Sequence, residues 1–145
     1  VWVAGHSLGA ALATLTVDRF PGARALYTYG SPRVGDRGFA KAFSAEAYRF
    51  VFGNDIITRL PPGGDYQHVG ELNALAGYEP GRKATREDAS AEAQPVLDLR
   101  QISRFFDRIT AGISEMVPAS LRDHVPILYS AQLRGELEAG RQNAT

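Results

Sequence analysis

The chain has 145 residues with 16 basic and 16 acidic side chains, so its formal net charge is zero. A chain without excess positive charge lacks the surface that nucleic acid requires, so we expect no nucleic acid partner. Hydrophobic residues make up 44% of the sequence, and the length suits one globular domain. No apolar run is long enough to cross a bilayer, and the absence of cysteine excludes disulfides without fixing the compartment.

The chain opens on an apolar run, Val1 to Ala4, which is followed by Gly5-His6-Ser7-Leu8-Gly9 and then by small residues. This order predicts a buried strand, a sharp turn that carries Ser7, and a helix. Glycines on both sides of the turn let the strand and the helix approach each other closely. The G-x-S-x-G pattern therefore predicts that Ser7 is a nucleophile, placed at the positive end of a helix dipole.

Strands and helices continue to alternate along the first half of the chain. Residues 25–29 have the pattern of a short buried strand, Asp36 can cap a helix, and residues 48–52 predict a third strand. Residues 66–72 are expected to form one more short strand. This rhythm predicts an α/β fold with a mostly parallel sheet and flanking helices.

The second half has a different composition. Residues 77–94 are rich in glycine, alanine and charge, and they predict a surface loop. Apolar residues from 99 to 116 recur at helical spacing and predict an amphipathic helix, whose apolar face we expect to pack on the sheet. Three arginines of this helix recur every fourth residue: Arg100, Arg104 and Arg108. Such a stripe suggests peripheral contact with an anionic lipid surface. A last helix is expected from Pro126 to about Gly140.

Serine chemistry needs a base that takes the hydroxyl proton and a carboxylate that orients the base. On a doubly wound sheet these groups follow the serine in the order acid, then histidine. Asp55 comes directly after the third strand, where the acid is expected. Downstream of it lie His68 and His124, and the order of residues leaves both open as the base. The backbone N–H of Leu8, the residue after the serine, is the expected oxyanion donor.

Several of these motifs together resemble the class 3 lipases, the fungal-type triacylglycerol lipase family of α/β hydrolases. The matching segments are Gly5 to Ala10, Tyr27 to Asp36, Asn54-Asp55 with Leu60-Pro61, and Asp123-His124 with Tyr129. The resemblance implies that Ser7 is the nucleophile, Asp55 the acid and His124 the base. It also implies that His68 is structural, since it lies in a strand that follows the acid loop in the family.

The resemblance implies a carboxylic ester hydrolase that acts on lipid or other esters through an acyl-enzyme. We expect no metal, because three scattered histidines and no cysteine give no ligand spacing, and no cofactor, because no phosphate-binding or dinucleotide-binding pattern is present. Triacylglycerol lipase, phospholipase A1 and short-chain esterase remain open, and the alternative is a hydrolase-fold module that binds without catalysis. We expect residues 1–145 to be the C-terminal part of one such domain, with a divergent insertion at about 77–121. The first strands, the lid and the second oxyanion donor would then lie upstream. This chain alone is therefore expected to be nearly inactive, with an exposed apolar edge along its first strand.

Overall fold

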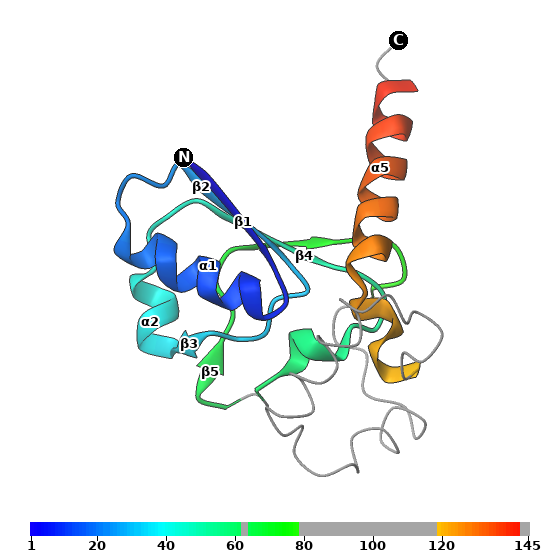
Figure 1. Cartoon of the computed structure of the whole chain (residues 1–145). Helices are drawn as coiled ribbons and strands as arrows, with labels where there is room; N and C mark the ends of the chain where they lie inside the picture. The colour runs from blue at the N-terminus through cyan, green and yellow to red at the C-terminus, as the bar shows by residue number, and fades with distance from the viewer. Residues whose placement is uncertain (62–63, 79–118, 143–145) are drawn as a thin grey trace.

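The computed structural model describes residues 1–61, 64–78 and 119–142 (Figure 1). Its main sheet has four parallel strands, in the spatial order β1 (Trp2–His6), β2 (Ala25–Tyr29), β4 (Ala47–Val51) and β6 (Glu71–Ala74). Its α-helices are α1 (Leu8–Arg19), α2 (Arg37–Ala42) and α5 (Pro126–Gln142). This parallel sheet with flanking helices confirms the predicted α/β class. None of the helices in the described part of the chain has the length and apolar character needed to cross a membrane.

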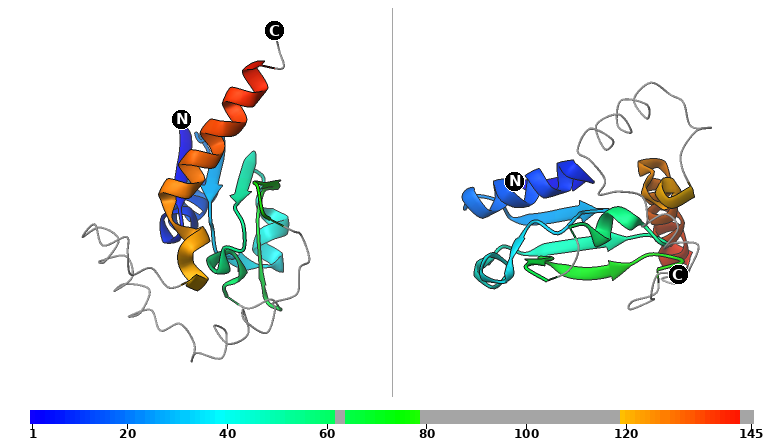
Figure 2. Two further views of the ribbon diagram at one scale, coloured as in Figure 1. Left: turned by 90° about the vertical axis from the view of Figure 1, so that its right-hand side faces the viewer. Right: turned by 90° about the horizontal axis from the view of Figure 1, so that it is seen from below.

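The core forms where α1 packs on one face of the sheet. Ala13 and Val17 of α1 contact Leu26 of β2, which is fully buried. Phe43, at the end of α2, packs against the same cluster. Because side chains alternate between the faces of a strand, Tyr29 points to the opposite face from Leu26. Helix α5 begins on that second face, near the carboxyl ends of the strands (Figure 2).

The prediction of a fourth strand was wrong in one respect, because residues 66–72 do not form a single element. They are divided between β5 (Tyr66–Gln67), which pairs antiparallel with β3 (Gly35–Asp36), and β6 in the main sheet. The break falls at Gly70, whose φ of 84° turns the chain. A Cβ there would lie 2.9 Å from the Cβ of Ala47, so the turn needs a glycine.

Other local predictions are confirmed with small shifts. The Asp36 carboxylate caps α2 by accepting a 2.7 Å hydrogen bond from the Phe39 N–H. The third predicted strand begins and ends one residue earlier than expected. Helix α5 begins at Pro126 as predicted and ends two residues beyond Gly140. The predicted helix over residues 99–116, with its arginine stripe, and nearly all of the insertion at 77–121 lie outside the described residues.

Strand β1 occupies one edge of the four-stranded sheet. Trp2 is 65% exposed, and the guanidinium of Arg24 lies 5.5 Å from its ring centroid. The apolar edge that the sequence predicted is therefore exposed in the structure. Such an edge presents backbone N–H and C=O groups that another strand can pair with.

Candidate active site

Ser7 lies on a strained turn between β1 and α1. Its φ of 57° and ψ of −128° are unusual for a residue with a side chain, and its N–H donates to the Tyr29 carbonyl at 3.0 Å. A Cβ at Gly5 would lie 2.4 Å from the Gly9 oxygen, so strand and helix meet here without room for a side chain. The sequence predicted a close approach at both glycines that flank the turn. This prediction was wrong for Gly9, where an added Cβ would meet no described atom within 4 Å.

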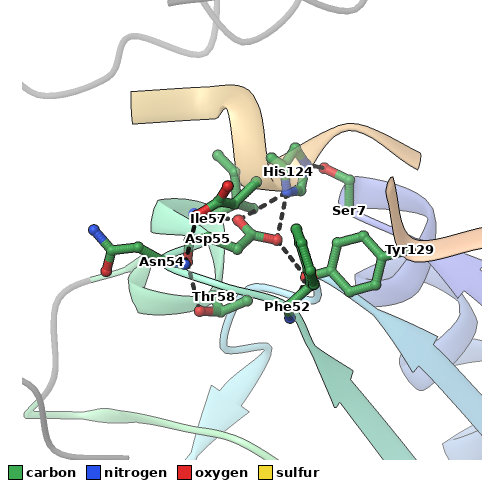
Figure 3. A network of polar contacts seen from close by, with 9 residues as sticks. Ser7, Phe52, Asn54, Asp55, Ile57, Thr58, His124 and Tyr129 are labelled. Atoms are coloured by element: carbon green, nitrogen blue, oxygen red, sulfur yellow. Dashed lines mark hydrogen bonds and ion pairs between the residues drawn. The ribbon is translucent and has the colours of Figure 1, made fainter. Parts of the chain in front are cut away.

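The structure brings Ser7, Asp55 and His124 into one buried chain of contacts (Figure 3). The Ser7 hydroxyl makes no capping bond to α1; it lies 2.6 Å from Nε2 of His124 instead. On the other side of the ring, Nδ1 lies 2.9 Å from both carboxylate oxygens of Asp55. All three residues are at most 2% exposed, so little water competes for these contacts.

Two further donors hold the Asp55 carboxylate. The Ile57 N–H donates to Oδ1 at 3.0 Å, and the Tyr129 hydroxyl donates to Oδ2 at 2.6 Å (Figure 3). Donors converging on both oxygens suit the ionised carboxylate, which can only accept. Burial, followed by the nearby charge of Asp55, raises the pKa of Tyr129 far above its usual value, so its hydroxyl keeps its proton.

This arrangement favours one tautomer of the His124 ring. With an acceptor-only carboxylate at Nδ1, the His124 ring carries its proton there, and Nε2 is left as an acceptor that faces the Ser7 hydroxyl. A neutral imidazole in this orientation can take the hydroxyl proton as the serine attacks a carbonyl. The geometry therefore suits nucleophilic acyl transfer.

The sequence motifs contained two supporting residues whose roles the sequence analysis did not assign. Gly30 follows β2 with a φ of 57°, and a Cβ there would lie 2.6 Å from Oδ2 of Asp55 and 3.1 Å from Nδ1 of His124. Tyr129 reaches back from α5, with its hydroxyl also accepting from the Phe52 N–H at 3.2 Å. Both belong to segments that carry the family resemblance, but their contacts join residues far apart in the sequence.

The structure separates His68 from this chain of contacts. Its Nε2 lies 2.8 Å from the Thr58 carbonyl oxygen, in the short 3₁₀ helix η1 (Ile56–Arg59) that follows Asp55. Burial, with a smaller contribution from the positive charge of Arg49, lowers the pKa of His68 to about 4. This placement suits the structural role that the resemblance implies.

His6 lies against the His124 ring. The two rings have centroids 4.6 Å apart, and the His6 ring also meets the Tyr129 ring edge-on at 5.6 Å. Burial lowers the pKa of His6 to about 4, with a smaller lowering contribution from the neighbouring His124 ring, so the His6 ring stays neutral at pH 7. His6 therefore packs an uncharged ring against the His124 ring.

The remaining predicted site residue, Leu8, opens α1. Its backbone N–H is among the first four of the helix, which have no acceptor within the helix itself. Across residues 1–61, 64–78 and 119–142, no group of three or more histidine, aspartate or glutamate side chains is arranged to hold a metal ion.

Comparison with known proteins adds independent information. Residues 1–64 match the family described as lipase (class 3). Secreted mono- and diacylglycerol lipase 1 of Fusarium solani is 47% identical over 68 residues, which cover 41% of this chain and 20% of the relative. Phospholipase A1-II 6 of Oryza sativa subsp. japonica is 35% identical over 103 residues, which cover 55% of this chain and 25% of the relative.

Among solved structures, the chain is similar to the lipase of Rhizomucor miehei in its propeptide complex. The identity is 37% and the TM-score 0.46, over 50% of this chain and 27% of that chain. This chain spans about a fifth of the length of the first curated relatives that it matches. The match over residues 1–64, together with these relatives, supports the resemblance to the class 3 lipase family that the sequence motifs indicated.

Proposed function

We propose that the protein hydrolyses carboxylic esters of lipids through an acyl-enzyme on Ser7. The observation that carries this proposal is the buried sequence of contacts from the Ser7 hydroxyl through the His124 ring to the Asp55 carboxylate, with distances of 2.6 and 2.9 Å. The names of the relatives support lipids as the substrate class, because they include mono- and diacylglycerol lipases and phospholipases A1.

The reaction proceeds in two halves. Ser7 Oγ attacks the ester carbonyl while His124 Nε2 takes the hydroxyl proton, and the same proton then passes to the leaving alcohol. Water next attacks the acyl-enzyme while His124 Nε2 takes a proton from it, and this proton passes to Ser7 Oγ as the Oγ–acyl bond breaks and the carboxylic acid leaves. Asp55 holds the ring and stabilises its positive charge, and the Leu8 N–H donates to the oxyanion of each tetrahedral intermediate.

We further propose that residues 1–145 form part of one lipase-type domain, with the divergent insertion at about 77–121 between the acid and the base. The return of His124 and Tyr129 to the Asp55 carboxylate supports this organisation. Contact with an anionic lipid surface through Arg100, Arg104 and Arg108 is a separate prediction. Vesicle binding that is unchanged after all three are replaced by glutamine contradicts it.

Hydrolysis of p-nitrophenyl esters with short to long acyl chains by the whole protein tests the function. We expect turnover with a burst of acylation, and we expect Ser7→Ala to abolish both without unfolding the protein. The dependence on chain length separates an esterase from a lipase. A folded protein that neither hydrolyses these esters nor reacts with an active-serine probe contradicts the proposal and favours the non-catalytic binding module.

The same assay on the 145-residue chain tests the expectation that this chain alone is nearly inactive. Loss of one oxyanion donor costs roughly a hundred- to a thousandfold in rate, so a comparably slow turnover is expected. Hydrolysis by the chain at the rate of the whole protein contradicts this expectation.

A further inference from the structure

The segment that carries the triad histidine is bonded to the acid loop at two consecutive positions. His124 contacts Asp55 at 2.9 Å, and the preceding residue, Asp123, accepts a 2.6 Å hydrogen bond from the backbone N–H of Asn54. Both contacts join residues that are 69 positions apart in the chain. Two adjacent bonds between the same two segments fix their relative position better than one bond, because a single bond leaves a pivot.

The acid loop is shaped to receive the Asp123 carboxylate. Gly53 has a φ of 51°, and a Cβ on it would lie 2.5 Å from Oδ2 of Asp123. The Gly53 N–H also donates to the Ala76 carbonyl at 3.2 Å, which ties the loop to the residues that directly follow β6. The carboxylate therefore meets a turn that is anchored to the sheet and has no side chain in its way.

We propose that Asp123 is a positioning residue that sets the place of the triad base relative to the triad acid. This proposal rests on the proposed hydrolase function, because positioning matters only if His124 transfers a proton. Asp123 acts through the backbone of its segment: its bond to the Asn54 N–H keeps the His124 ring between Asp55 and Ser7. A displacement of about 1 Å at a catalytic group can cost about a hundredfold in rate.

The test compares two substitutions in the whole protein. Asp123→Asn keeps an oxygen that can accept from the Asn54 N–H, whereas Asp123→Ala removes the acceptor. We expect Asp123→Ala to slow labelling by a fluorophosphonate probe about ten- to a hundredfold per folded molecule, and Asp123→Asn to slow it only a few fold. The matched control is Asp65→Ala, which removes the same group from an exposed position and should leave labelling unchanged.

A second readout does not depend on catalysis. The proton shared between His124 Nδ1 and Asp55 gives a strongly downfield NMR signal when the contact is held. We expect this signal to persist in Asp123→Asn and to be lost or exchange-broadened in Asp123→Ala. If the wild-type protein shows the signal but no serine-dependent labelling, the hydrolase function fails while the positioning effect on the signal still stands.

Three results overturn the proposal. The first is labelling of Asp123→Ala at the wild-type rate per folded molecule, which would leave Asp123 with a role in stability alone. The second is equal slowing by Asp123→Asn and Asp123→Ala, which would assign the effect to the charge. The third is a downfield signal that is unchanged in Asp123→Ala.

Discussion

Tyr129→Phe removes a hydroxyl group that donates to the buried Asp55 carboxylate. The phenyl ring can keep the edge-on contacts that Tyr129 makes with His6, Tyr29 and Phe52, so no cavity is expected. What is lost is a 2.6 Å hydrogen bond to the Asp55 carboxylate and the acceptor for the Phe52 N–H. A hydrogen bond to a charged group contributes about 1.5–3 kcal/mol and a neutral one about 1, so the free energy of unfolding should fall by about 2–4 kcal/mol.

The same substitution should also lower catalytic activity modestly. Without the Tyr129 hydroxyl, the Asp55 carboxylate keeps its contacts with the Ile57 N–H and the His124 ring. Because His124 also keeps its contact with Ser7, kcat/KM should fall by about tenfold or less, which is below the effect of about a hundredfold that a displaced catalytic group can have.

Urea unfolding and steady-state kinetics measure the two effects. Tyr48→Phe is the matched control, because the Tyr48 hydroxyl also donates to a carboxylate, that of Glu46, but on the exposed surface. Its removal should change the free energy of unfolding much less and leave kcat/KM unchanged. Equal stability losses in the two variants, with no fall of kcat/KM in Tyr129→Phe, would refute the supporting role of the Tyr129 hydroxyl.

Three further predictions follow from the structure. His6 and His68 have pKa values of about 4 when folded and near 6.5 when unfolded. The unfolded state therefore binds more protons between these values, and stability should fall as pH drops from 6.5 to 4, by at most about 3 kcal/mol each because the rings are only partly buried. NMR titration of either ring near pH 6.5 in the folded protein would contradict this. Gly30→Ala places a Cβ 2.6 Å from the Asp55 carboxylate at a φ of 57°, so the free energy of unfolding in urea should fall by several kcal/mol. The control is Gly135→Ala, in a helix with open space around it, which should raise the free energy of unfolding by up to about 1 kcal/mol. The exposed edge of β1 should make the 145-residue chain self-associate, and a cooperatively folded monomer in sedimentation measurements would count against this expectation.

Features that depend on residues close together in the chain were predictable from the sequence. The turn at Ser7, the cap at Asp36 and the start of α5 at Pro126 each follow from local steric or hydrogen-bonding preferences. The division of residues 66–72 was missed, because the turn at Gly70 is imposed by the approach of Ala47 from another strand.

The residue types of the candidate site were predictable from the sequence, whereas the residues that hold them in place were less so. The order of residues left His68 and His124 both open, because a pattern along the chain does not show which ring returns to the serine. In the structure the choice depends on α5 and on the segment before it, which carry Tyr129 and Asp123 to the Asp55 loop. Contacts between residues about 70 positions apart leave no local periodicity that a sequence pattern could reveal.

The backbone conformation of Ser7 lowers the stability of the fold while it holds the hydroxyl next to His124. A φ of 57° with a ψ of −128° costs an ordinary residue about 1–3 kcal/mol, whereas glycine adopts positive φ with little cost. Ser7→Gly should therefore be tolerated or even favoured in any selection for thermostability alone, although it deletes the proposed nucleophile. A programme of directed evolution on this protein should screen for turnover in every round, because heat challenge by itself rewards the loss of the serine.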